Sequence, residues 1–349
     1  MTTEWSDGYL NAIGSEVGFW VDQSSTARLF LARSAYNGSG DAQSYLDFVV
    51  GGVEGEPLDF ALRQGYPPAE GCAALNRDLG PGSFVFSLYG PNEGVDGLMV
   101  GTVGSLTPEA WYRDDAPGIN AWWGGSDWVL RQQYGSVLTA YGRGGEATVP
   151  IYEPAVSPLG APLSGKPWVL GHQVIFGLGA YVSASIWAYD EALGTHPLLT
   201  FGDDLTRGAA NVGTDGVDLV WTQGEGKVAG EEGLYRIVSI MTSPFTTDPA
   251  ALASRRLRSD MSTGIGTHQN QFAVGCGYAG RILATGRDAE IVRLQDGAAW
   301  VLSGNDEWKW NYVLGFTCKE LFITVFDAVS RYGIARLPLD SLGDPLAPD

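Results

Sequence analysis

Short runs of apolar residues recur along the chain, and many of them directly follow a glycine. Runs of about four to eight residues rich in Val, Ile, Phe, Trp and Tyr, with Gly, Pro, Asn and Asp between them, predict β-strands joined by turns. The glycines before such runs are Gly14, Gly82, Gly125, Gly171, Gly213, Gly275 and Gly315. The intervals between them are 68, 43, 46, 42, 62 and 40 residues. This regular spacing indicates an internal repeat.

A repeat of about 40 to 50 residues is typical of the four-stranded blades of a β-propeller, in which each sheet packs on its neighbours. A further strand is predicted in most repeats, over residues 27–31, 136–140, 183–187, 235–240, 290–294 and 333–337. We therefore predict an all-β fold, with residues 1–349 forming a single β-propeller domain of seven blades and six or eight blades as alternatives. Glycine also precedes strands in other β proteins because it adopts turn geometries easily. A β-sandwich and a β-helix are therefore the alternative folds.

The two long intervals and the chain ends need their own explanation. In the 62-residue interval, residues 223–233 and 244–259 are predicted to be loop insertions, and in the 68-residue interval the strand-like residues 45–50 indicate a degenerate blade. Only two strands fit between Gly315 and the end of the chain. If the sheets close into a ring, residues from the N-terminus must complete the last blade.

Four segments carry a resemblance to a known group of proteins. They are GTDGVDLVW at 213–221, SIMTSPFTTDPAAL at 239–252, AVGCGYAGRIL at 273–283 and GIARLPLDSLG at 333–343. Their pattern resembles the blades of uncharacterised bacterial exported, lipoprotein-like β-propeller proteins, and the resemblance covers about residues 205–343. It implies the fold and export from the cytoplasm, and it implies no activity.

Composition and charge narrow the choice of partners. The chain has 49 Gly, 12 Trp, 15 Tyr and 13 Phe with only 17% charged residues, as expected for short strands and many turns. Its 40 Asp and Glu outnumber its 21 Lys and Arg, which gives a net charge of −19. So acidic a surface repels phosphate backbones and anionic lipid headgroups. Nucleic acid is therefore not an expected partner, although Arg255, Arg256 and Arg258 form one small basic cluster.

The sequence also bears on localisation. The start, residues 1–5, lacks the basic and apolar regions of a secretory signal. With the resemblance, this predicts a periplasmic or secreted protein in its mature form, and a cytoplasmic protein is the alternative. Residues 169–189 carry no formal charge, but three glycines and several polar residues interrupt the apolar ones. We expect paired strands there and no membrane span.

Catalysis at the mouth of a central channel is one possible function. A histidine beside carboxylates at such a site serves as a general base, and an arginine neutralises developing negative charge. The candidates for a polysaccharide lyase or hydrolase are His172, His268 and Arg281, with Arg207 as a further arginine. The competing interpretation is that the histidines are structural turn or strand residues.

Two cysteines occupy similar places in consecutive repeats. Cys276 and Cys318 follow their repeat glycines by one and three residues. Neighbouring inner strands would bring them within the Cα separation of about 7 Å that a disulfide requires. Both a disulfide and two buried thiols are compatible with the sequence. Cys72 is left without an evident partner.

The sequence predicts no metal centre. It contains no paired Cys or Cys/His spacing of the kind that binds zinc. The carboxylate pairs at 114–115 and 203–204, and the pair Asp215 and Asp218, allow Ca²⁺ as the one cofactor considered. The alternative is that these Asp side chains accept hydrogen bonds from their own turns.

Clustered tryptophans are the candidate ligand-binding residues. They are Trp122, Trp123, Trp128, Trp308 and Trp310, which lie in polar, Gly-flanked contexts. Exposed tryptophans beside polar side chains stack on sugars or cap apolar ligands, whereas buried ones pack between blades. No nucleophile-elbow, P-loop or dinucleotide-binding motif is present. We therefore predict a non-enzymatic recognition or scaffold propeller with a glycan, peptide or protein partner, and leave catalysis as the alternative.

Overall fold

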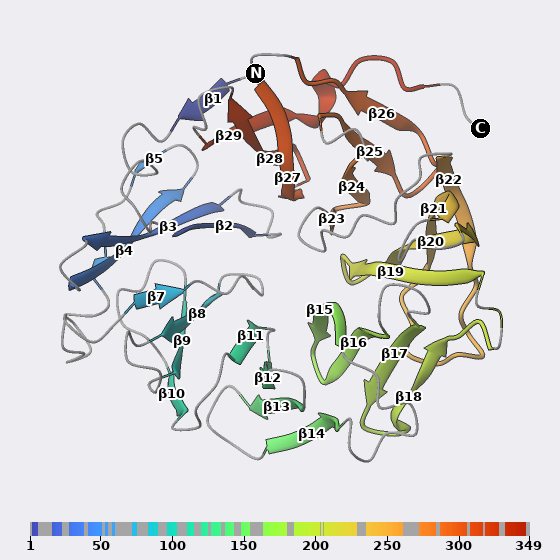
Figure 1. Ribbon diagram of the computed structural model, residues 1–349, viewed down its shortest axis with the longest axis horizontal. Helices are drawn as coiled ribbons and strands as arrows, with labels where there is room; N and C mark the ends of the chain where they lie inside the picture. Colours follow the sequence, from blue (N-terminus) through green and yellow to red (C-terminus); the bar gives the residue numbers. More distant parts are fainter. Residues whose placement is uncertain are drawn as a thin grey trace. The chain divides into compact units, whose positions relative to one another are not determined.

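The computed structural model consists of β-strands, and the helical structure in the part that it describes is one 3-10 turn, η2 (Leu339–Ser341) (Figure 1). The predicted all-β class is confirmed. The residues described are 2–5, 16–22, 28–37, 41–50, 53–54, 58–59, 72–74, 83–89, 96–102, 110–114, 120–124, 127–133, 137–142, 148–153, 163–179, 185–202, 204, 206–228, 235–260, 272–283, 287–305, 308–316, 318–327 and 332–346. Side chains are described only within residues 127–346.

The strands group into two compact units, which we call the N-terminal unit (residues 6–153) and the C-terminal unit (residues 1–5 and 154–349). The N-terminal unit contains β2 (Glu16–Asp22), β3 (Arg28–Asn37), β4 (Asp41–Val50), β5 (Val53–Glu54), β6 (Leu58–Asp59), β7 (Cys72–Ala74), β8 (Ser83–Tyr89), β9 (Asp96–Thr102), β10 (Ala110–Asp114), β11 (Asn120–Gly124), β12 (Trp128–Gln133), β13 (Leu138–Gly142) and β14 (Thr148–Tyr152).

The C-terminal unit contains β1 (Thr2–Trp5), β15 (Leu163–Leu170), β16 (Gln173–Leu178), β17 (Ser185–Asp190), β18 (Gly194–Leu199), β19 (Arg207–Thr214), β20 (Asp218–Lys227), β21 (Tyr235–Pro244), β22 (Arg255–Asp260), β23 (Phe272–Gly275), β24 (Tyr278–Ile282), β25 (Ala289–Arg293), β26 (Ala299–Leu302), β27 (Trp308–Phe316), β28 (Glu320–Asp327) and β29 (Tyr332–Pro338).

The described strands form seven antiparallel sheets, three in the N-terminal unit and four in the C-terminal unit. In the C-terminal unit the sheet orders are β15-β16-β17-β18, β19-β20-β21-β22, β23-β24-β25-β26 and β27-β28-β29-β1. Within each of these sheets consecutive strands pair antiparallel, as hairpins do. Sheets of four strands are the units that the repeat predicts, and the seven-blade count stays a prediction.

The N-terminal strand completes the last sheet, as predicted. β1 pairs antiparallel with β29, with Thr2 opposite Arg336 and Trp5 opposite Gly333. Three strands from the end of the chain and one from its beginning therefore form a single sheet. These backbone hydrogen bonds join the two ends of the sequence within the C-terminal unit.

The repeated glycines of the C-terminal unit lie at equivalent places, where the first strand of each sheet turns into the second. Gly171 lies in the turn before β16, Gly213 and Gly315 lie near the ends of β19 and β27, and Gly275 ends β23. The strand that follows each of these glycines is therefore the second strand of its sheet. The first strands were missed because sequences such as β19 (RGAANVGT) are rich in small residues with weak strand preference. Three repeat glycines, those at 14, 82 and 125, lie outside the described residues.

Close packing between neighbouring sheets explains one of these glycines. The first strands β15, β19, β23 and β27 contact one another in turn. A Cβ atom on Gly213 of β19 would lie 2.8 Å from Val274 of β23 and 3.3 Å from Trp168 of β15. Because real Cβ contacts are longer than this, only glycine fits between the two side chains without a shift.

Two predicted loop insertions are partly strands. Residues 223–227 belong to β20, and residues 255–259 belong to β22. Their polar residues are compatible with a sheet because they pair with one another: Glu225 accepts hydrogen bonds from Arg256 and Gln223. Residues 169–189 span parts of β15, β16 and β17. Among the residues that the structure describes, no helix is both long and apolar enough to cross a membrane.

Candidate binding face at the hairpin turns

The turns of the four sheets in the C-terminal unit form the candidate site. In an antiparallel sheet of consecutive strands, the turn between strands one and two and the turn between strands three and four lie at the same end. Contacts between neighbouring sheets then bring these turns together. We call the surface that they form the hairpin-turn face.

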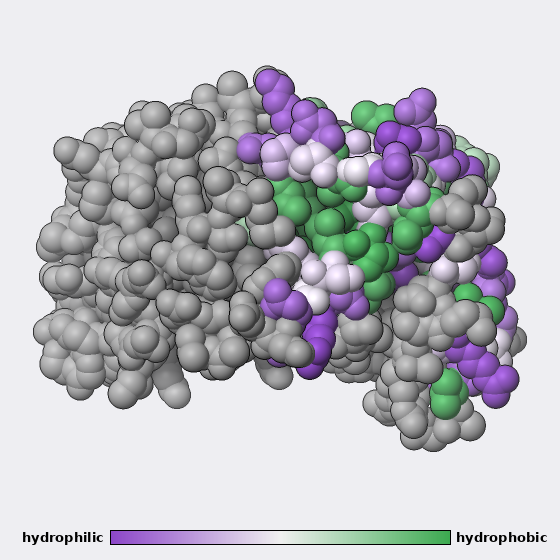
Figure 2. All heavy atoms as spheres, turned by 90° about the horizontal axis from the view of Figure 1, so that it is seen from above, coloured by the Kyte–Doolittle hydropathy of each residue, from purple (hydrophilic) through white to green (hydrophobic). Residues whose placement is uncertain are grey.

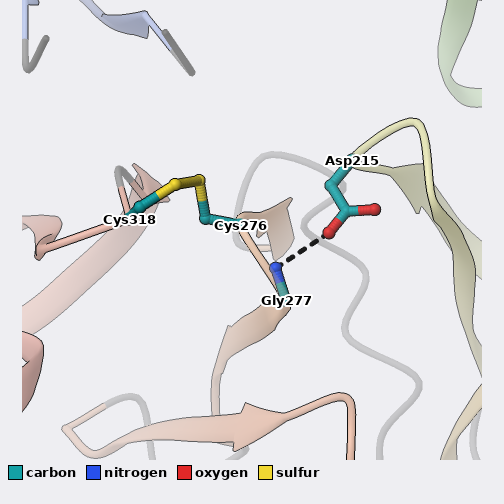
Figure 3. The surroundings of a disulfide bond; sticks show 4 residues. All are labelled: Asp215, Cys276, Gly277 and Cys318. Atoms are coloured by element: carbon teal, nitrogen blue, oxygen red, sulfur yellow. Dashed lines mark hydrogen bonds between the residues drawn. A yellow bond between two sulfur atoms is a disulfide. The ribbon is translucent and has the colours of Figure 1, made fainter. Parts of the chain in front are cut away.

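One carboxylate links the turns of two neighbouring sheets. Asp215 lies between β19 and β20, and its Oδ1 accepts hydrogen bonds from the backbone N–H of Val217 and of Asp218, at 3.0 and 2.8 Å. Its Oδ2 accepts a hydrogen bond of 2.8 Å from the N–H of Gly277, which lies in the turn between β23 and β24 (Figure 3). The side chain therefore holds its own turn and attaches it to the next one.

A disulfide links that second turn to a third. Cys276 lies in the β23–β24 turn and Cys318 lies between β27 and β28, and their Cα atoms are 5.0 Å apart (Figure 3). The sequence allowed either a disulfide or two buried thiols, and the disulfide is what the structure contains. Cys318 is exposed and Cys276 is partly buried, so the bridge lies at the surface.

The β23–β24 turn has the geometry that favours a tight hairpin. Cys276 and Gly277 both have positive φ, 47° and 77°. Gly275 and Tyr278 form the closing pair. Two central residues with φ above zero match the right-handed twist of the flanking strands. The left-handed conformation is unusual for cysteine and is held by the disulfide and by the bond to Asp215.

A second group of contacts joins the sheets β15–β18 and β19–β22. His172 Nδ1, in the β15–β16 turn, lies 2.8 Å from Oε1 of Glu191, in the β17–β18 turn. Leu170, at the end of β15, lies beside Gly216, with its δ-carbons 3.9 Å from the position of a Cβ there. The turns after β15, β17 and β19 are therefore neighbours.

A hydrogen-bonded network anchors the β17–β18 turn to the loop after β21. Asp190 Oδ1 accepts hydrogen bonds from the N–H of Ala192 and of Leu193, and its Oδ2 accepts one from the Thr247 hydroxyl. The ring of His196 lies between two carbonyl oxygens, at 2.8 Å from Gly194 and 2.6 Å from Thr247. The pKa of Asp190 is lowered, chiefly by the N–H of Leu193, because these bonds stabilise the ionised form.

Large apolar side chains are exposed at these turns. The described residues of this kind are Leu170 (39% exposed), Leu193 (57%), Val217 (72%), Val301 (38%) and Leu346 (43%). The first three belong to the hairpin-turn face, and the last two lie on β26 and on the C-terminal segment that bridges to it. Figure 2 shows another side of the molecule, where apolar residues also gather between hydrophilic ones.

Negative charge accumulates around the β19–β20 turn. The pKa of Asp218 is raised, first because burial disfavours its charged form and then because Asp215 is close, while Arg255 acts in the opposite direction. Burial is the larger cause of this pKa shift, and the smaller contribution of Asp215 is that of a nearby negative charge. A cation brought to this turn would offset the repulsion between the two carboxylates.

The structure buries two of the predicted ligand-binding tryptophans. Trp128 and Trp310 are 6% and 1% exposed, and Trp310 belongs to the apolar core between the last two sheets. Their rings pack inside the protein, as the alternative interpretation expected, and offer no free face to a ligand. The side chains of Trp122, Trp123 and Trp308 lie outside the described residues, so ligand binding by them stays a prediction.

The predicted catalytic residues are not brought together by any described contact. His172 is exposed at a turn beside Glu191. Arg281, on β24, is buried, and its Nε donates a hydrogen bond of 2.7 Å to Glu290, which Arg258 also contacts at 3.2 Å. These partners make Arg281 part of the packing between two sheets. His268 lies outside the described residues.

The carboxylate pairs are the candidate metal ligands named from the sequence. Within the described ranges, no group of three or more His, Cys, Asp or Glu side chains is arranged to hold a metal ion. Asp215 accepts hydrogen bonds from backbone N–H groups, and Asp204 accepts them from Thr206. These two carboxylates thus have the turn-forming role that the alternative interpretation gave them.

Leu170, Leu193 and Val217 were not among the ligand-binding residues predicted from the sequence. A signal was present, because Leu193 precedes Gly194 and Val217 lies between Gly216 and Asp218, residue types that are typical of turns. The sequence does not show that these residues lie on neighbouring turns, because that depends on contacts between turns about 20 to 50 residues apart in the chain.

No protein-family model matches the chain, and a search of curated proteins finds no match. Solved structures do resemble it. The β-propeller domain of the Trilobed protease from Pyrococcus furiosus has a TM-score of 0.58 at 9% identity, covering 95% of this chain and 99% of that one. YCF48 from Cyanidioschyzon merolae gives 0.52 at 10% identity, covering 92% and 96%. Oligogalacturonate lyase in complex with manganese gives 0.50 at 12% identity, covering 94% and 98%.

The chain spans about half the length of other structures that it matches, 47% of a prolyl endopeptidase, 54% of puromycin hydrolase and 50% of oligopeptidase B from Leishmania major. Identities this low show the fold alone. Together with the four-stranded sheets described above, these similarities establish that the chain has the β-propeller fold predicted from its repeat.

Proposed function

We propose that this protein is a non-enzymatic recognition propeller that binds a protein partner through the hairpin-turn face. The observation that carries the proposal is the exposure of three large apolar side chains, Leu170, Leu193 and Val217, on turns that contact one another. Gathered apolar residues on the surface of a strongly charged protein are typical of interaction sites. Single exposed apolar residues are common, so their proximity is what matters.

The fixed geometry of the turns supports the same proposal. Asp190 and Asp215 hold the backbone of two of these turns by hydrogen bonds, and Asp215 together with the Cys276–Cys318 disulfide attaches the later turns to one another. A surface that is already ordered loses less conformational entropy when it binds. The hairpin-turn face therefore loses little conformational entropy when its apolar side chains bind a partner.

Catalysis has less support among the described residues. His172 contacts a carboxylate at the surface, while Arg281 is engaged with Glu290 in the interior. The fold occurs in oligogalacturonate lyase and in peptidases as well as in YCF48, so the fold favours neither function. A lyase or hydrolase thus stays the alternative, and no observed geometry favours it.

We also propose that the protein works in an oxidising compartment, the periplasm or the cell exterior. The disulfide supports this, because such bonds persist outside the cytosol and are rare within it. Alkylation of free thiols in intact source cells tests the idea. Protection of Cys276 and Cys318 from alkylation is expected, and free thiols at both positions would contradict export.

Affinity capture with matched variants tests the recognition function. The variant Leu193→Ser/Val217→Ser removes apolar surface from the hairpin-turn face. The control Val301→Ser/Leu346→Ser removes the same number of exposed apolar side chains from the β26 region. We expect wild type and control to recover the same partner from an extract of the source cells, and the face variant to recover about tenfold less. Equal recovery by all three proteins, with unchanged circular dichroism, would rule out the face.

A further inference from the structure

The most continuous part of the hairpin-turn face lies on two sheets. We call it the turn patch and define it as Leu170, His172, Glu191, Leu193 and Val217. His172 and Glu191 are joined at 2.8 Å, Leu193 follows Glu191 by two residues, and Leu170 lies beside the glycine that precedes Val217. Three exposed apolar side chains therefore lie on the same neighbouring turns as one exposed ionisable pair.

Carboxylates dominate the charged groups on the turns that carry the patch. Glu191 is 64% exposed in its side chain, and Asp190, Asp215, Asp218 and Asp248 lie on the same or adjoining turns. Among the described residues there, Arg255 is the basic group that stays charged, and it donates hydrogen bonds to the carbonyl oxygens of Leu294 and Gln295 on the next sheet. The local excess of negative charge has the same sign as the net charge of −19.

The closeness of these carboxylates favours a positively charged ligand. Asp218 has its pKa raised by burial and by the charge of Asp215. A cationic group placed near it would offset this repulsion, whereas an anionic group would add to it. The patch therefore combines apolar area with selectivity for positive charge.

Resting on the function proposed above, we infer that the turn patch binds a basic amphipathic segment of the partner protein. Apolar side chains of the segment cover Leu170, Leu193 and Val217. Its Lys or Arg side chains lie toward Glu191 and Asp218. Apolar contacts supply most of the affinity in such an arrangement, and the charges supply orientation and rate of association.

Other macromolecules fit the patch less well. Nucleic acids and anionic membranes both present negative charge, which the carboxylates would repel. A neutral glycan would gain nothing from the excess charge. A basic protein segment is the occupant that matches both the apolar and the acidic character.

Synthetic peptides provide the test. The probe is a fluorescent peptide of alternating Leu and Lys. The comparison peptides are alternating Leu and Glu, and alternating Gly and Lys. Binding to the intact protein is measured by anisotropy at about 50 and about 300 mM salt, because screening at the higher salt weakens charge contacts and spares apolar ones.

Two matched pairs of variants separate the patch from the overall charge. Glu191→Gln/Asp218→Asn removes two charges at the patch, and Asp340→Asn/Asp344→Asn removes two from the C-terminal segment. Leu193→Ser/Val217→Ser and Val301→Ser/Leu346→Ser form the corresponding apolar pair. Within each pair, both variants change the net charge by the same amount. Non-specific electrostatic attraction therefore affects both members of the pair equally.

We expect the Leu-Lys peptide to bind wild type and both control variants alike. The apolar patch variant should weaken binding about tenfold and the charge variant about threefold, the latter with a smaller dependence on salt. Equal binding to all variants, or equally tight binding of the Leu-Glu peptide, would overturn the inference. If the partner is still lost from the apolar patch variant in affinity capture while the charge variant captures normally, the inference fails and the proposed recognition function stands.

Discussion

The two junctions on either side of the β23–β26 sheet are built differently. Toward β19–β22 a smaller apolar cluster that includes Val220, Ile240, Val274 and Val292 is supplemented by polar contacts. Arg258 on β22 donates a hydrogen bond to Glu290 on β25, and Asp215 accepts one from the N–H of Gly277. Toward β27–β29 the disulfide and a large apolar core that includes Trp310 and Phe316 join the sheets. Only the first junction adjoins the turn patch.

The difference suggests a division of roles. The junction with the disulfide and the larger apolar core holds the last sheet. In that sheet β1 pairs with β29, although the two strands lie at opposite ends of the sequence. The polar contacts of the other junction position turns whose side chains remain exposed. Directional hydrogen bonds and ion pairs set geometry, whereas apolar burial supplies most of the free energy of folding.

The largest effect is expected at the polar contacts of the junction with β19–β22. Glu290 is 4% exposed in its side chain and contacts both Arg281 and Arg258. Replacing it by Gln removes the negative charge that both guanidinium groups approach in a buried setting, and should lower the free energy of unfolding by about 3 kcal/mol. Urea denaturation measures this. The exposed ion pair of Arg293 with Asp296 is the control, since Asp296→Asn should leave the free energy of unfolding nearly unchanged.

The next effect is expected at the disulfide. The double variant Cys276→Ser/Cys318→Ser opens a cross-link between residues separated by 42 positions. It should lower the free energy of unfolding by about 2–4 kcal/mol, because the unfolded chain gains entropy. Calorimetry with and without dithiothreitol provides an internal control. Reductant should lower the Tm of wild type and leave that of the double variant unchanged, and no change in wild type would contradict the prediction.

A smaller effect tests the close approach of the first strands. Gly213→Ala places a methyl group 2.8 Å from Val274, and should cost about 1–3 kcal/mol. Val274→Ala removes the atom that it meets. If the contact is the cause, the double variant will be more stable than the sum of the two single changes predicts. Strict additivity would show that the close approach is not what requires glycine.

The smallest effect concerns Asp218 and has the opposite sign. Its pKa is raised in the folded protein, so its ionised form opposes folding once the pH exceeds the unfolded value. Asp218→Asn should therefore raise the Tm by about 1–2 °C near pH 7, and this gain should vanish near about pH 3, where the carboxyl is protonated in both states. Asp190→Asn serves as the contrast, because a lowered pKa predicts a loss of stability above the unfolded pKa.

The fold was more predictable than the site. The interval between repeat glycines predicted sheets of about four strands, and the shortage of strands after Gly315 predicted that the N-terminus completes the last sheet, which β1 does by pairing with β29. Both inferences use only local strand patterns and counting. The burial of Trp128 and Trp310 was not predictable, because a polar sequence context does not reveal whether a ring lies inside the protein.

The sequence by itself determined the strand repeat and the acidic character of the protein, since both depend on residues close together in the chain or on composition. Tertiary structure alone decided that Asp215 links two turns, that Cys276 bonds to Cys318, that Arg281 is held by Glu290, and that Leu170, Leu193 and Val217 lie on neighbouring turns. The physical reason is that sheets pack through side chains from distant repeats. Local sequence patterns determine where each strand begins and ends and where the chain turns. The packing of whole sheets determines which turns are neighbours.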